Sequence, residues 1–206
     1  MHENSAVVRE ERGKADLAVI MVHGRAQGPE DMAVHADRLD IEGVRYVFPQ
    51  ADGRSWYPNK FMASVQSNEP ALSAAIAHYD HVVTSLMADG FSSDRIVLCG
   101  FSQGACLTSE YIARHPRRYA GAIIWTGGLI GPKGSVWPLR YELTGMPAYL
   151  SSSEIDAWVP PERTRETHDW MIQSGAQPTI DIFPDRDHMV DDTEIAAAKA
   201  LILSVK

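Results

Sequence analysis

The chain has 206 residues, of which 45% are hydrophobic and 22% are charged, a balance typical of an ordinary globular protein. Its 27 acidic and 19 basic residues give a formal net charge of -8, which argues against nucleic acid or an anionic membrane surface as a partner. The length suits one domain, so we expect a single domain over residues 1–206, with a polar segment at residues 1–16.

The amino-terminal segment is charged and lacks the continuous apolar run of a secretory signal. The longest apolar runs, such as residues 17–22, have the length of a strand and are too short to cross a bilayer. The two cysteines, Cys99 and Cys106, fit neither a zinc site nor a redox pair, and we expect both to be core thiols in a reducing compartment. The expected location is therefore the cytoplasm, without stable membrane association.

Short apolar and β-branched runs predict six buried strands, and helical patterns lie between most of them. The strands are expected over residues 17–22, 44–48, 95–100, 121–128, 147–152 and 179–183. The helices are expected over residues 30–39, 69–89, 103–114, 161–174 and 192–204. Because the strands are continuously apolar rather than alternating, they indicate a mainly parallel sheet that is covered on both faces. The predicted fold class is α/β, an open and doubly wound sheet without a large lid.

The segment GFSQG places Ser102 between two glycines, where the strand expected at 95–100 turns into the helix expected at 103–114. This context is typical of a nucleophile elbow, in which small flanking residues relieve crowding in a strained turn. Ligands of such sheets bind at the carboxyl ends of the strands, where Ser102 lies. The five letters alone would also fit a structural turn, but their context favours a nucleophile.

A serine nucleophile needs a base, usually a histidine that a carboxylate holds in place. Of the eight histidines, only His188 follows the last predicted strand in a short polar loop, as the chain order nucleophile, acid, base requires. We expect the acid in the loop after residues 147–152, and favour Asp156 over Glu154. Asp187 is close to His188 in sequence but is the weaker candidate, because it follows a later strand.

Backbone N–H groups are expected to stabilise the negative charge that develops on the substrate carbonyl oxygen. One such group belongs to Gln103, the residue after the proposed nucleophile, and the other to Arg25 in the loop MVHGRAQGPEDM, residues 21–32. The alternative for the His-Gly pair in this loop is an ordinary turn from strand to helix.

Taken together, these residues resemble the phospholipase/carboxylesterase family of α/β hydrolases, which includes bacterial carboxylesterases and acyl-protein thioesterases. The resemblance rests on VHGRAQGPEDM, on GRSWYP at 53–58, on GFSQGAC, on the D-x-x-V-P pattern that begins at Asp156, and on His188. It implies the α/β-hydrolase fold and a serine esterase without metal or organic cofactor, with Ser102, Asp156 and His188 as the catalytic triad.

Two positions depart from the family pattern. Ala26 stands where the family usually has glycine, and Asp187 stands where a glycine usually precedes the histidine. We expect Asp187 to point to solvent beside Arg186. Asp191 and Asp192, which follow His188, suit the amino terminus of the helix expected at 192–204 better than a metal site, because the helix dipole favours acidic residues there.

The substrate pocket is expected to be apolar and rich in aromatic residues, as small-ligand sites usually are. Its expected lining is Trp56, Tyr57, Leu129, Trp137, Trp158 and Val159. For each tryptophan, the anchoring of a loop is the alternative. The chain shows no long apolar insertion, which favours short or aromatic acyl esters over long-chain substrates.

The leading hypothesis is a carboxylesterase that acts on a small-molecule ester through an acyl-enzyme. A lysophospholipase or an acyl-protein thioesterase is the alternative among enzymes. A catalytically silent hydrolase fold that binds a ligand is the alternative outside them, and a homodimer is left open.

Overall fold

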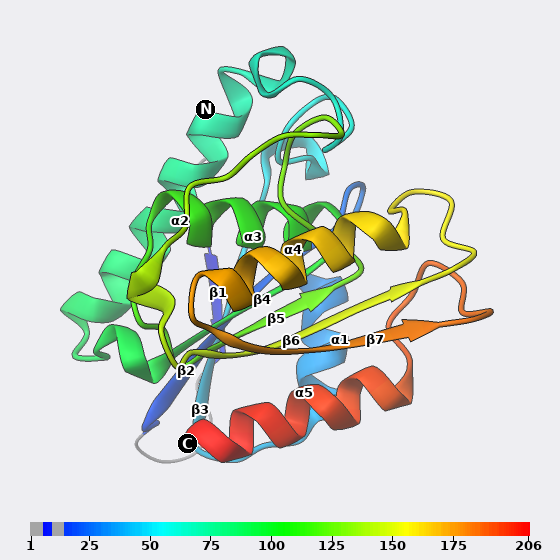
Figure 1. The fold of residues 1–206 in the computed structure, drawn as a ribbon. Helices are drawn as coiled ribbons and strands as arrows, with labels where there is room; N and C mark the ends of the chain where they lie inside the picture. Colours follow the sequence, from blue (N-terminus) through cyan, green and yellow to red (C-terminus); the bar gives the residue numbers. More distant parts are fainter. Residues whose placement is uncertain (1–5, 10–14) are drawn as a thin grey trace.

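Seven strands form one sheet in the computed structural model, which describes residues 6–9 and 15–206 (Figure 1). Within these ranges the strand order is β1-β3-β2-β4-β5-β6-β7, and every neighbouring pair is parallel except β1 with β3. The strands are β1 (Ala6–Arg9), β2 (Leu17–Val22), β3 (Val44–Pro49), β4 (Ile96–Phe101), β5 (Gly121–Trp125), β6 (Pro147–Ser153) and β7 (Gln177–Phe183). The open, mainly parallel sheet predicted from the sequence is confirmed.

Helices cover both faces of the sheet (Figure 1). The α-helices are α1 (Pro29–Leu39), α2 (Ala71–Ala88), α3 (Gln103–Arg114), α4 (Pro161–Gln173) and α5 (Asp192–Val205). Short 3-10 helices lie at Asp52–Arg54, Val65–Asn68, Ser93–Arg95 and Tyr141–Leu143. Helices α2, α3 and α4 pack on one face, whereas α1 and α5 pack on the other.

The central strands are buried on both faces, which explains their continuous apolar sequence. In β2, Ala18, Ile20 and Val22 belong to the core under α2, α3 and α4. Leu17, Val19 and Met21 alternate with them and belong to the core under α1 and α5. All six side chains are fully buried, so both faces of this strand must be apolar.

The segment expected to be only polar, residues 1–16, contains a strand that the sequence did not reveal. Residues 6–9 form β1, which pairs antiparallel with β3 at the edge of the sheet, Ala6 opposite Pro49 and Arg9 opposite Tyr46. Residues 1–5 and 10–14 lie outside the described part of the chain. A strand of four residues at a sheet edge leaves too short a pattern to be distinguished from the charged residues around it.

The parallel order brings the loops that follow β2, β4, β6 and β7 to one edge of the sheet, on the right for β6 and β7 in Figure 1. The residues predicted to form the triad and to stabilise the carbonyl oxygen follow these four strands, whereas several of the predicted pocket residues follow β3 and β5. Among the described residues, none of the helices combines the length and the apolar character needed to cross a membrane.

Candidate active site

Ser102 occupies a strained turn between β4 and α3. Its φ of 54° and ψ of -118° lie outside the usual regions for a residue with a side chain, which is typical of an elbow that presents a nucleophile. The backbone N–H of Ser102 donates to the Trp125 carbonyl at 3.0 Å and so ties the turn to β5. A Cβ at Gly104 would overlap the Val22 carbonyl, and one at Gly100 would overlap the Gly104 carbonyl. Both glycines therefore let α3 start against the sheet.

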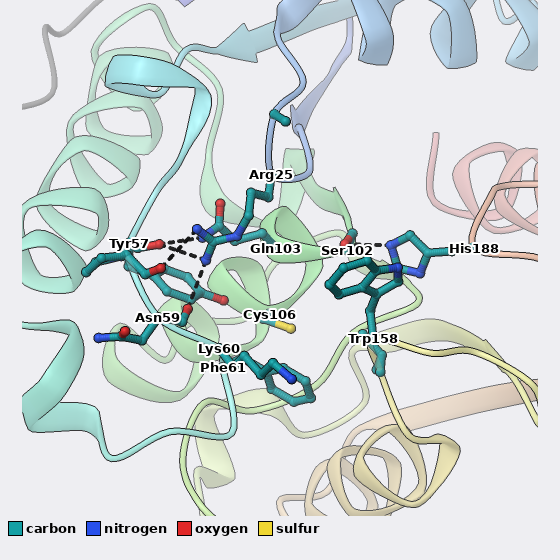
Figure 2. Close-up of a pocket in the computed structure, with 13 residues that line it drawn as sticks. Arg25, Tyr57, Asn59, Lys60, Phe61, Ser102, Gln103, Cys106, Trp158 and His188 are labelled. Atoms are coloured by element: carbon teal, nitrogen blue, oxygen red, sulfur yellow. Dashed lines mark hydrogen bonds between the residues drawn. The ribbon is translucent and has the colours of Figure 1, made fainter.

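The structure brings Ser102, His188 and Asp156 together from three different loops. Nε2 of His188 lies 2.8 Å from Oγ of Ser102 (Figure 2), and Nδ1 of His188 lies 2.7 Å from Oδ2 of Asp156. Since a carboxylate only accepts hydrogen bonds, it holds the imidazole proton on Nδ1 and leaves Nε2 able to accept the serine proton. This is the geometry of a nucleophile, its base and the acid that orients the base.

The Asp156 carboxylate is held from both sides and is fully buried. Its second oxygen, Oδ1, accepts the backbone N–H groups of Trp158 at 2.9 Å and Val159 at 2.8 Å. Burial by itself would raise the pKa of Asp156, but the hydrogen bonds from His188 and from these two backbone groups outweigh it, and its pKa is lowered. Asp156 is therefore a carboxylate when the imidazole is neutral.

The two rival acids do not reach the imidazole. Glu154 accepts a hydrogen bond from Arg165 at 2.6 Å, on the exposed side of the loop. Asp187 is exposed, as expected from the sequence. Among the candidates from the sequence, only Asp156 contacts His188.

Arg186 belongs to the loop that carries His188, and its side chain is buried beneath this loop, with only 7% of the residue exposed. One terminal nitrogen, Nη1, donates to the carbonyls of Asp187 and Met189, the residues on either side of His188. The guanidinium therefore fixes the backbone at both neighbours of the histidine. No sequence pattern singles out Arg186, because a buried arginine and an exposed one look alike in a short polar loop.

The same guanidinium connects this loop to the rest of the fold. Nη2 donates to Oγ1 of Thr126 at the end of β5, at 2.8 Å, and Nε lies 3.4 Å from Oε2 of the fully buried Glu194. Glu194 also caps α5: it accepts the backbone N–H of Asp191, whose side chain in turn accepts the N–H of Glu194. Asp191 therefore caps a helix, as expected, and Asp192 pairs with Arg38. Within the described residues, no group of three or more His, Cys, Asp or Glu is placed to hold a metal.

Arg25 and Gln103, the residues expected to supply backbone donors, both line the cavity beside Ser102. The loop that carries Arg25 is fixed from behind by the fully buried His23. Nε2 of His23 accepts the Ala51 N–H at 3.1 Å, so the proton is on Nδ1, which donates to the Gly24 carbonyl at 2.7 Å. Burial lowers the pKa of His23, in keeping with this neutral form.

The side chains of Arg25 and Gln103 add a contact that the sequence did not suggest. The Gln103 amide accepts from Trp56 N at 3.0 Å and donates to the Tyr57 carbonyl at 2.8 Å. The Arg25 guanidinium donates to Oγ of Ser55 and to the carbonyls of residues 57, 58 and 59. Both residues therefore fix the segment 55–59 against the elbow.

Ala26, the departure from the family pattern, adopts a φ of 61°. This left-handed conformation costs a non-glycine residue about 1 kcal/mol. The backbone N–H of Ala26 donates to the Arg54 carbonyl at 2.8 Å, which holds the loop in this shape. The loop therefore keeps a glycine-like conformation without the glycine.

A cavity of about 590 Å³ opens beside Ser102 and His188 (Figure 2). Three residues expected in the pocket, Tyr57, Trp158 and Val159, line it. The remaining lining consists of Arg25, Ala26, Pro58, Asn59, Lys60, Phe61, Gln103 and Cys106, together with Ser102 and His188. Cys106 follows Ser102 by four residues on α3, so helical spacing could have identified it.

The structure corrects the other three pocket residues, none of which lines this cavity. Trp56 is buried behind it, and its indole N–H donates to the His23 carbonyl at 2.8 Å. Leu129 is buried in the core under α2, α3 and α4. Trp137 packs on the Arg163 guanidinium, whose central carbon lies 5.4 Å from its ring. The two tryptophans anchor loops, which was the alternative interpretation of their role.

Comparison with known proteins places the chain in a family. Residues 3–205 match the family model described as Phospholipase/Carboxylesterase. The chain belongs to the phospholipase/carboxylesterase family. A crystal structure of a phospholipase/carboxylesterase from Dyadobacter fermentans is 34% identical, with a TM-score of 0.91, over 98% of this chain and 97% of that chain.

The chain also shows more distant similarity to curated proteins. Lysophospholipase-like protein 1 of Mus musculus is 22% identical over 218 residues, which cover 93% of this chain and 88% of that protein. A putative carboxymethylenebutenolidase of Salmonella typhi is 27% identical over 163 residues, or 73% of this chain. The chain spans only 59% of the length of that relative.

Proposed function

We propose that this family member is a serine carboxylesterase that hydrolyses small-molecule esters through an acyl-enzyme. The observation that carries the proposal is the continuous chain of hydrogen bonds from Ser102 through His188 to the buried Asp156. A protein that only bound a ligand would need neither the strained elbow nor the oriented imidazole. The family match over residues 3–205 supports the same chemistry.

In the proposed reaction, Ser102 Oγ attacks the ester carbon while His188 Nε2 takes its proton. The negative charge on the carbonyl oxygen is stabilised by the backbone N–H groups of Arg25 and Gln103. His188 then donates the proton to the leaving alcohol. Water, activated by the same imidazole, releases the acid and restores Ser102.

Two other side chains that line the cavity, Cys106 and Tyr57, carry groups that would be nucleophilic if they were ionised. Burial raises the pKa of the Cys106 thiol to about 12, and it raises the pKa of the Tyr57 hydroxyl well above its ordinary value. Both are therefore protonated near neutral pH, so neither is an activated nucleophile.

A fluorophosphonate probe tests the nucleophile. We expect it to label wild type at Ser102 and to leave Ser102→Ala unlabelled, with ester turnover lowered at least about a thousandfold. Cys106→Ala is the matched control, because it removes a neighbouring side chain of the same cavity. Hydrolysis that survives in a folded Ser102→Ala variant would refute the mechanism and favour a binding role.

The size of the cavity supports the proposed preference for short or aromatic acyl groups over lysophospholipids and long-chain thioesters. Its 590 Å³ suits a small ligand, and the 65% exposed Trp158 lies at its rim. We expect kcat/KM to be highest for short or aromatic members of an ester series from acetyl to palmitoyl. Trp158→Ala should lower kcat/KM for the aromatic esters, whereas Trp137→Ala, outside the cavity, should not. A maximum at palmitoyl would favour the thioesterase alternative.

A further inference from the structure

The cavity beside Ser102 differs in charge from the rest of the molecule. The whole chain carries an excess of acidic residues, with a formal net charge of -8. Among the described residues that line the cavity none is acidic, yet Arg25, Lys60 and His188 are among them. An anionic ligand would therefore meet cationic side chains here and no carboxylate in the lining.

The two permanent cations of the cavity, Arg25 and Lys60, have no anionic partner among the described residues. Arg25 directs both terminal nitrogens at the Ser55 hydroxyl and at backbone carbonyls, which are neutral acceptors. Lys60 is exposed. Within the part of the chain that the structure describes, neither forms an ion pair with a carboxylate, whereas Arg54, Arg114 and Arg165 each do. Among the described residues, no ion pair therefore compensates the positive charge of these two side chains.

The position of His188 indicates which part of an ester would meet this charge. His188 must protonate the leaving alcohol, so the alcohol lies on the histidine side of Ser102 and the acyl group on the other side. In Figure 2, His188 lies to the right of Ser102, whereas Cys106, Lys60 and Phe61 lie below and to the left of both. Since Lys60 lines the same cavity, an acyl group that lies away from His188 would extend toward the side of Lys60.

We propose that the preferred substrates are esters whose acyl group ends in a carboxylate, that is, monoesters of dicarboxylic acids, with Lys60 binding the distal carboxylate and the charge of Arg25 attracting it. This inference rests on the proposed function. An ammonium group binds a carboxylate by charge-assisted hydrogen bonds, and Phe61 and Cys106 offer apolar contact to the methylene groups between the two ends.

Matched pairs of 4-nitrophenyl esters test the proposal. The glutaryl monoester is compared with the valeryl ester, and the succinyl monoester with the butyryl ester, so that only the terminal charge differs substantially. We expect wild type to have the higher kcat/KM for the charged member of at least one pair. Lys60→Met should lower the ratio of kcat/KM, charged over neutral, by about fivefold, and Lys60→Glu by more. High salt should lower the wild-type ratio, because it screens exposed charges.

Lys133→Met is the control, since Lys133 is exposed and does not line the cavity, and it should leave both ratios unchanged. The proposal is overturned if wild type prefers the neutral member of both pairs, or if Lys60→Met leaves the ratio unchanged. Failure of the proposed function looks different: hydrolysis of both the charged and the neutral esters would then be absent, or would persist in Ser102→Ala.

Discussion

The Asp156 carboxylate accepts a hydrogen bond from Nδ1 of His188 and so determines which imidazole nitrogen can accept a proton. An asparagine at position 156 can keep the backbone hydrogen bonds of Trp158 and Val159 through its carbonyl oxygen. Its amide group would then donate to Nδ1 and shift the imidazole proton to Nε2, which faces Ser102. We expect Asp156→Asn to lower kcat about ten-thousandfold, with little change in the midpoint temperature of thermal unfolding.

The rival acids serve as controls for this substitution. Asp187 is exposed and Glu154 pairs with Arg165, so Asp187→Asn and Glu154→Gln should each change kcat less than about threefold. Steady-state kinetics of the three purified variants, with a thermal unfolding curve for each, provides the measurement. A larger loss in Asp187→Asn than in Asp156→Asn would show that the acid is misassigned.

At the scale of single residues, the sequence could reveal those whose chemistry depends on chain order. Ser102, Asp156 and His188 each follow a predicted strand, and the structure brings their side chains together. Lys60 and Phe61 lie in an irregular loop, where no periodicity tells a lining side chain from a solvated one. Trp56 was misplaced because composition does not show that its indole N–H has a buried acceptor.

At the scale of elements, the loop between β7 and α5 is held by one buried arginine. Replacing Arg186 by Met would leave the Glu194 carboxylate buried without its cation and would free the carbonyls on either side of His188. We expect Arg186→Met to lower the free energy of unfolding by about 3 kcal/mol and to lower kcat at least about tenfold. Urea unfolding and kinetics at a temperature where the variant is folded measure both effects.

A second substitution separates loss of stability from loss of positioning. Arg186→Met/Glu194→Gln removes the buried unpaired charge, so it should recover part of the stability but not kcat, because the loop carbonyls still lack their donor. Arg165→Met, which breaks the exposed pair with Glu154, should cost less than about 1 kcal/mol. Full recovery of kcat in the double variant would mean that Arg186 acts on stability alone.

The bounds of the central strands could be predicted because burial on both faces leaves a continuous apolar run, and those of most helices from the spacing of their apolar residues. The strand expected at 17–22 is β2 without change, and the helix expected at 103–114 is α3. The helix expected at 69–89 begins later, at Ala71, after the 3-10 turn Val65–Asn68. By contrast, among the described strands β1 pairs only with β3. The sequence of such an edge strand does not show by itself that it pairs with β3.

At the scale of the whole molecule, two histidines couple folding to pH. Burial lowers the pKa of His23, and burial with the nearby Arg38 lowers the pKa of His35 to about 4. His23 also uses Nε2 as an acceptor for Ala51 N–H, a bond that protonation would remove. Below about pH 6.5, the usual histidine value, the unfolded chain therefore binds more protons than the folded chain.

The stability that these histidines contribute is thus complete above about pH 6.5 and is lost as pH falls toward about 4. We expect the free energy of unfolding to fall by roughly 2 kcal/mol between pH 7.5 and pH 5. Burial raises the pKa of Glu194, which opposes this trend, so the histidine contribution is read from variants. His35→Gln should flatten the pH dependence measured by urea unfolding, whereas the exposed His81→Gln should leave it unchanged. Equal slopes in wild type and His35→Gln would show that protonation of His35 is not coupled to folding.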